Sequence, residues 1–174
     1  MGERFFVASC VFTEGEPELS RKVQTYVKDR FSLPIIRCCV AKYKVQEFEE
    51  RMACEYCHGK GNGQCVQKDD MQKIYVKLHE ANMLVLAAPI YYHGISGQLK
   101  CVIDRFYAML YPVAPPALRK VSMFLSSGDD NMYDGAKFSY EGDFLGYLGL
   151  EDMGIFTNHD RNVLPAIRKM AMSL

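Results

Sequence analysis

The stretch Met83-Leu-Val-Leu-Ala-Ala-Pro-Ile-Tyr-Tyr-His-Gly94, followed at once by Ile95-Ser-Gly-Gln-Leu-Lys-Cys-Val-Ile-Asp-Arg-Phe106, decides the fold of this 174-residue chain. The apolar run from Met83 to Ala88 has the length and character of a strand buried on both faces. We expect Pro89 to end it, because proline cannot donate to a sheet ladder. After a loop, apolar residues recur at helical spacing, which predicts a helix. In open α/β sheets such a loop, at the carboxyl end of a buried strand, is where ligands bind, and its two tyrosines and histidine suit a flat aromatic ligand.

The rest of the chain repeats this alternation. We expect further strands at residues 5–12, 33–40, 121–125 and 153–156, and helices at 17–31, 71–78 and 138–148. A last helix would follow a cap at Asp160, with Val163, Leu164, Ile167 and Met170 facing inward. Strands alternating with helices predict an α/β fold, a doubly wound five-stranded parallel sheet with helices on both faces. We expect one domain over residues 1–174, with a Cys- and Gly-rich insertion at about 41–68.

Composition excludes several classes of protein. Lys and Arg balance Asp and Glu at 21 each, so no basic surface favours nucleic acid or an anionic membrane. The longest apolar runs fall far short of the ~20 residues that a transmembrane helix needs. The first residues contain no apolar signal-peptide core, so we expect a cytoplasmic protein. The seven cysteines therefore favour metal binding, redox chemistry or plain burial over a disulfide framework.

Three segments carry a resemblance to a known family. They are Cys65-Val-Gln-Lys-Asp-Asp-Met71, Ala87-Ala-Pro-Ile-Tyr-Tyr-His-Gly-Ile-Ser-Gly-Gln-Leu-Lys100 and Ile103-Asp-Arg105. They resemble the NADPH-dependent FMN reductase and iron–sulfur flavoprotein branch of the flavodoxin-like families, over roughly residues 54–174. The resemblance implies strand order 2-1-3-4-5, FMN at the carboxyl edge of the sheet, and NAD(P)H or a redox protein as electron partner. It also implies homodimers or homotetramers that bury the flavin between subunits.

The same resemblance implies which residues hold the flavin. The ring would be lined by Pro89, Ile90, Tyr91, Tyr92, His93 and Gly94, with Ser126, Ser127, Gly128 and Tyr133 in the neighbouring loop. Tyr91 or Tyr92 can stack on the flavin ring, although a turn with two ordinary surface aromatics is the alternative.

The expected phosphate loop departs from the family pattern. It reads Ser9-Cys-Val-Phe-Thr-Glu-Gly-Glu-Pro-Glu-Leu-Ser20, with Glu14, Glu16 and Glu18 where the FMN phosphate would meet a helix N-terminus. Each like charge nearby costs on the order of 1–4 kcal/mol, although acids in a first helical turn also complement the helix dipole. Ser9, Thr13 and backbone N–H groups remain as phosphate ligands.

The cysteines depart from the pattern as well. The iron–sulfur branch carries four cysteines in a compact run, but Arg51 stands three positions before Cys54, leaving Cys54, Cys57 and Cys65. A cluster usually takes four thiolates, and Cys10 or Cys39, at the carboxyl ends of the first two strands, are candidates for the fourth. Zinc is equally open, with His58 as a possible ligand. A set of free thiols is the alternative.

Two functional hypotheses follow. The first is an FMN-dependent NAD(P)H oxidoreductase or flavin electron-transfer protein, in which the cofactor carries the redox chemistry and no side chain is assigned as a proton-transfer catalyst. The second is a flavodoxin-like domain that has lost FMN and serves as a cysteine-based iron–sulfur or zinc binding or interaction module. The acidic loop favours the second hypothesis, and residues 89–100 favour the first.

Overall fold

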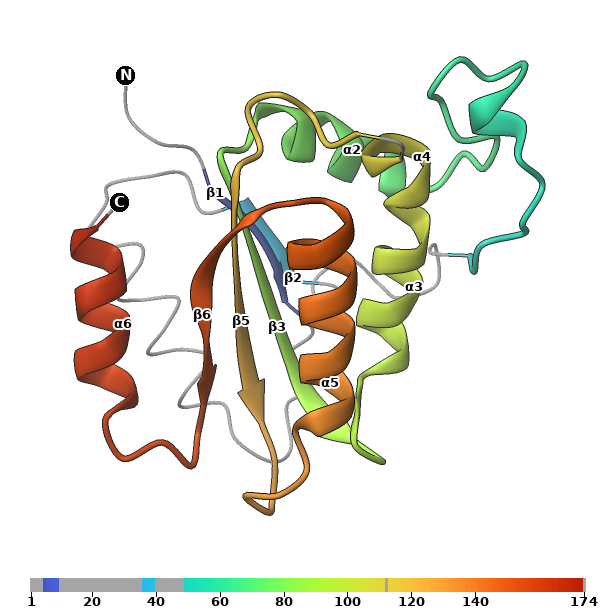
Figure 1. Ribbon diagram of the computed structural model, residues 1–174. Helices are drawn as coiled ribbons and strands as arrows, with labels where there is room; N and C mark the ends of the chain where they lie inside the picture. The colour runs from blue at the N-terminus through green and yellow to red at the C-terminus, as the bar shows by residue number, and fades with distance from the viewer. Residues whose placement is uncertain (1–4, 10–35, 40–48, 112, 174) are drawn as a thin grey trace.

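A single twisted sheet organises the molecule, as the computed structural model shows for residues 5–9, 36–39, 49–111 and 113–173 (Figure 1). Its strands are β1 (Phe5–Ser9), β2 (Ile36–Cys39), β3 (Met83–Tyr91), β5 (Lys120–Ser126) and β6 (Glu151–Thr157). They pair in parallel in the order β2-β1-β3-β5-β6. The two-residue strand β4 (Gly94–Ile95) pairs antiparallel with β3, so the sheet is mixed and not wholly parallel. The expected α/β, flavodoxin-like class is confirmed.

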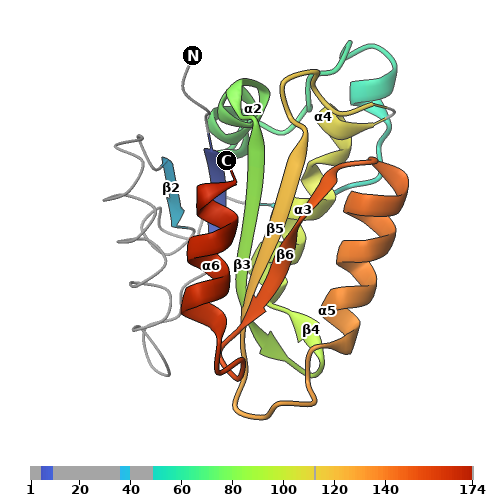
Figure 2. The same cartoon turned by 60° about the vertical axis from the view of Figure 1, so that its left-hand side comes forward.

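Helices cover both faces of the sheet. Figure 2 shows α6 (Val163–Met172) on one face, and α3 (Gly97–Arg105) and α5 (Asp134–Ser139) on the other. The alternation of side chains along β3 separates the two cores, since Leu84 and Leu86 pack with the α3 side while Met83 and Val85 pack with α6. The remaining helical segments are α2 (Met71–Glu80), α4 (Tyr107–Leu110), the one-turn η2 (Tyr56–His58) and the π-helix η3 (Tyr140–Tyr147). The expected helix at 17–31 lies outside the described residues.

The expectation that Pro89 ends the central strand was wrong. β3 continues through Pro89, which pairs in register with Ser126 of β5, and reaches Tyr91. The described ladder between β3 and β1 ends at the pair of Ser9 and Ala87, so Pro89 lies beyond it, near the end of β3. A proline there removes one possible donor and leaves the pairing with β5 in place.

Two helices near the C-terminus also differ from expectation. The helix expected at 138–148 begins earlier, at Asp134, and turns into the π-helix η3 from Tyr140. On α6, Ile167 is buried as expected, but Leu164 is exposed. In the described part of the chain, no helix has the length and apolarity required to cross a bilayer.

Candidate functional site

A strained hairpin stands at the carboxyl end of the central strand. Tyr92 and His93 join β3 to β4, and both have positive φ, at 49° and 63°. Two-residue turns of this handedness normally use Asn or Gly, and a non-glycine residue held there costs on the order of 1–3 kcal/mol. The Tyr92 side chain is 100% exposed. The turn therefore presents an uncovered aromatic ring at the edge of the sheet where ligands bind in α/β folds.

The first turn of α5 supports this hairpin. A Cβ atom on Gly135 would lie 2.5 Å from the His93 carbonyl oxygen, so only glycine allows the two backbones to approach this closely. On the other side of the hairpin, buried Ser96 caps α3 by accepting a hydrogen bond from the Leu99 N–H at 3.4 Å. The hairpin is thus held between the N-termini of two helices.

The loop that follows β5 is tied to the loop that follows β6. The Ser127 N–H donates to Asn158 Oδ1, and Asn158 Nδ2 donates back to the Ser127 carbonyl, both at 3.0 Å. The buried Tyr133 hydroxyl lies 2.7 Å from Asn158 Oδ1 and 2.7 Å from His159 Nδ1. The polar groups of this loop are therefore already oriented at the same edge as the hairpin.

The structure gathers most of the expected flavin residues at this edge. Pro89, Ile90 and Tyr91 end β3, Tyr92 and His93 form the turn, and Gly94 begins β4. Ser126 ends β5, and Ser127, Gly128 and Tyr133 lie between β5 and α5. Ser9 ends β1 and pairs with Ala87, whereas Thr13 lies outside the described residues.

Sequence reasoning missed three residues of this edge: Gly135, Asn158 and His159. Asn158 and His159 come directly after β6, and the rule that ligand sites gather beyond the carboxyl ends of strands would have pointed to them. For Gly135 the sequence carries no such signal, because its role depends on the approach of α5 to the hairpin.

The expected metal ligands lie elsewhere. We call residues 49–68 the cysteine segment; Figures 1 and 2 show it beside α4, well apart from β2, which ends in Cys39. In the segment Cys54 is exposed, while Cys57 and Cys65 are buried. Burial raises the pKa of the Cys57 thiol, and the nearby Cys65 and Glu55 add to the rise. Cys10 lies outside the described residues.

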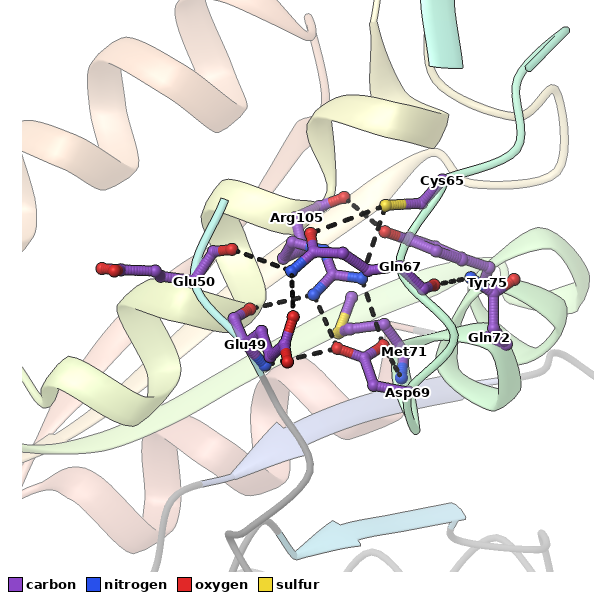
Figure 3. Close-up of polar contacts among 9 residues, drawn as sticks. All are labelled: Glu49, Glu50, Cys65, Gln67, Asp69, Met71, Gln72, Tyr75 and Arg105. Carbon is purple, nitrogen blue, oxygen red and sulfur yellow. Dashed lines mark hydrogen bonds and ion pairs between the residues drawn. The ribbon is translucent and has the colours of Figure 1, made fainter. Parts of the chain in front are cut away.

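A buried arginine anchors both ends of the cysteine segment (Figure 3). Arg105, at the end of α3, donates to Asp69 through both Nη1 and Nη2, at 2.7 and 3.1 Å. It also donates to the Glu49 carbonyl at 2.9 Å and to Cys65 Sγ at 3.4 Å. Arg105 is 3% exposed, so this paired cation fixes both ends of the segment to the core.

A surface cluster anchors the middle of the segment to α4. Arg51 Nη2 pairs with Glu55 Oε1 at 2.8 Å, and its guanidinium carbon lies 4.0 Å from the centre of the Tyr107 ring. The Tyr107 hydroxyl donates to Glu55 Oε2 at 2.9 Å, and this hydrogen bond raises the Tyr107 pKa. The His58 ring stacks on Tyr107 and Tyr111, with centroid distances of 4.3 and 4.8 Å. We call Arg51, Glu55, His58 and Tyr107 the clamp.

The described residues do not fit an iron–sulfur cluster or a zinc ion. Nowhere in this part of the chain do three His, Cys, Asp or Glu side chains converge as metal ligands. His58, the candidate fourth zinc ligand, stacks between tyrosines and has Nε2 3.0 Å from the Tyr107 carbonyl oxygen. The carboxyl edge, in contrast, fits a flavin ring, since it combines the exposed Tyr92 with the open backbone at Gly128.

The fold and the carboxyl edge define the class as a flavodoxin-like flavoprotein. The chain belongs to the NADPH-dependent FMN reductase family, whose sequence model matches residues 17–142. An iron–sulfur flavoprotein of Methanocaldococcus jannaschii is 38% identical over 78 residues, which cover 44% of this chain and 38% of that protein. The match thus spans well under half of that relative.

Solved structures share the fold at low sequence identity. The NAD(P)H:quinone oxidoreductase from Methanothermobacter marburgensis is 15% identical with a TM-score of 0.64, covering 99% of this chain and 94% of that one. An azoreductase from Bacillus anthracis is 14% identical with a TM-score of 0.60, covering 99% and 98%. The match to the FMN reductase family model agrees with the expectation of an FMN-dependent oxidoreductase.

Proposed function

We propose that this chain binds FMN at the carboxyl edge of its sheet and uses it to pass electrons from NAD(P)H to a second acceptor. The observation that carries the proposal is the β3–β4 turn, where Tyr92 is fully exposed in a strained conformation beside an ordered loop. Strain of this kind is typical of functional sites, where the surrounding structure holds it in place. When bound, FMN accepts a hydride and releases electrons one or two at a time.

The chain itself binds and orients the flavin. Tyr92 stacks on the ring, while the hairpin backbone from Pro89 to Gly94 offers N–H and C=O groups to the ring edge. Ser126, Ser127, Gly128 and Tyr133 form the adjoining wall, kept in place by Asn158. Ser9 and Thr13 would hold the phosphate together with backbone N–H groups.

The proposal extends to assembly and location. A fully exposed Tyr92 leaves one side of the flavin open to water, and a second copy of the chain would cover it in a homodimer or homotetramer. Cys54, Cys57, Cys65 and Cys101 are free thiols, which suits a reducing cytoplasm. The alternative of a cysteine-based metal module gains no support, because no described group of residues converges as metal ligands.

The test is flavin binding and reduction. Protein purified without oxygen should show the paired near-ultraviolet and blue bands of oxidised flavin on admitting air, and NADPH or NADH should bleach them under nitrogen. Tyr92→Ala should raise the FMN dissociation constant about tenfold, the loss expected for one stacked aromatic ring. Tyr147→Ala, an exposed tyrosine on η3, is the matched control and should bind FMN like the parent protein. A parent chain that stays colourless and binds no added FMN would overturn the proposal.

A further inference from the structure

The cysteine segment is one thiolate short of an iron–sulfur site. A cluster of the [2Fe–2S] or [4Fe–4S] type is normally held by four cysteines, and the segment supplies Cys54, Cys57 and Cys65. Among the described residues from 49 onward, the other cysteine is Cys101 on α3, and it does not join these three in a group of metal ligands. The names of the relatives imply a cluster, and the described residues from 49 onward do not bring together four thiols to hold one.

Arg51 stands where a fourth thiolate would extend the Cys-x-x-Cys spacing by one step toward the N-terminus. Its guanidinium cannot ligate a metal cation, and it is already engaged by Glu55 and the Tyr107 ring. Glu55 in turn accepts the Tyr107 hydroxyl, so the two side chains bind the segment to α4 together. The clamp therefore holds the segment against α4, a structural role that a bound cluster would otherwise have.

The opposite side of the same segment is still arranged to support a thiolate. Cys65 Sγ accepts a hydrogen bond from Arg105 Nη2, and Arg105 is held in place by Asp69. N–H groups that donate to cysteine sulfur stabilise negative charge on it, as they do around metal–thiolate centres. The segment thus has an arginine where a fourth thiol would stand, at position 51, and a hydrogen-bond donor beside the thiol of Cys65.

We propose that the cysteine segment is a metal-free arm, clamped to α4 by Arg51 and Glu55, in which Arg51 replaces the fourth ligand of an iron–sulfur site. The segment keeps its fold without iron. Replacing Arg51 alone with cysteine restores a four-thiolate site.

The test is anaerobic reconstitution of the whole purified protein with sulfide and equal amounts of ferrous and ferric iron, which together supply the oxidation level of a [4Fe–4S]2+ cluster, followed by removal of excess reagents. The parent protein and Arg51→Ala, the matched control that breaks the clamp without adding a thiol, should retain less than one iron per chain. Arg51→Cys should retain about four irons and about four sulfides and show a broad brown absorption. A parent protein that takes up about four irons overturns the proposal, and so does an Arg51→Cys variant that retains no more iron than Arg51→Ala.

A second measurement separates ligation from misfolding. Trypsin cuts after Arg51, Lys60 and Lys68, so Cys54 and Cys57 fall in one peptide and Cys65 falls in the next. In the native parent protein iodoacetamide should label exposed Cys54 and spare the buried thiols, to the same extent before and after treatment with iron and sulfide. Protection of parent Cys54 by that treatment would contradict the proposal. Circular dichroism on heating shows whether each variant is folded before its iron content is interpreted.

Discussion

Arg105 is a buried cation whose loss should cost more stability than that of any surface charge on the same helix. Its guanidinium is bidentate with Asp69 and Arg105 is 3% exposed, so Arg105→Met removes the cation that is paired with the largely buried Asp69 carboxylate. Breaking a buried pair in this way typically costs about 3–5 kcal/mol. Urea unfolding of the variant should show a loss of that size in the free energy of unfolding.

Lys100→Met on the same helix is the control. Lys100 pairs with Asp104 at an exposed position, where such pairs contribute about 0–1 kcal/mol. If the two variants lost equal stability, the network around Arg105 would not be the anchor described above.

Individual residues also show where sequence reasoning succeeds and fails. The apolar run from Met83 correctly predicts a central strand. Whether that strand ends at Pro89 depends on which strands pair with it there, and the sequence does not show this. Nothing in Tyr92-His93 predicts a two-residue hairpin turn, since neither residue favours positive φ. Such local exceptions are expected at functional positions, where the rest of the fold enforces them.

At the scale of elements, the approach of α5 to the hairpin should control flavin binding. Gly135→Ala would bring a methyl group within 2.5 Å of the His93 carbonyl oxygen, so the hairpin or the helix must move. We expect FMN affinity to fall about tenfold or more, which fluorescence titration with FMN would measure.

Gly142→Ala in η3 is the matched control, because a Cβ atom there would meet no atom within 4 Å. It should bind FMN as tightly as the parent protein. If the parent protein, Gly135→Ala and Gly142→Ala bound FMN with equal affinity, the position of the hairpin would not limit FMN binding.

Strands and helices were predictable to different degrees. The strand positions follow from apolar runs, which tolerate errors of a few residues at either end. The predicted start of the helix at residue 138 lies after its actual start at Asp134, because the glycines and tyrosines around it give no clear 3.6-residue period. Leu164 is predicted to face inward together with Val163, Ile167 and Met170, but it is exposed on α6.

At the scale of the whole molecule, stability should fall in alkaline solution. Burial raises the pKa of Tyr75 and Tyr140, and the hydrogen bond to Glu55 raises that of Tyr107. Below about pH 10 these hydroxyls are protonated in both states. Above about pH 10 the tyrosines of the unfolded chain lose their protons first, which stabilises the unfolded state. The free energy of unfolding therefore decreases as pH rises.

Urea midpoints measured between about pH 8 and pH 11 check this trend. Tyr140→Phe removes a buried hydroxyl that lies 2.8 Å from the Val121 carbonyl oxygen and 2.7 Å from Asp152, and it should make the alkaline decrease smaller. A midpoint independent of pH across that range would contradict the assignment.

The whole fold was easier to predict than the whole site. Alternation of strands and helices is a property of the entire chain, so the α/β class follows from many residues at once. The site combines the ends of several strands, and the hydrogen bonds between Asn158 and Ser127 can be inferred only once β6 is known to lie beside β5. Cys39 was a candidate metal ligand because the cysteine segment follows the carboxyl end of the second strand, but the segment lies beside α4, apart from β2 (Figures 1 and 2).

The most direct test of the central claim, a flavin at the carboxyl edge, is amide hydrogen exchange with and without FMN. We expect FMN to slow exchange at residues 90–95 and 126–133 and to leave residues 49–68 unchanged. Protection confined to residues 49–68, or none at the hairpin when FMN is bound, would contradict the account.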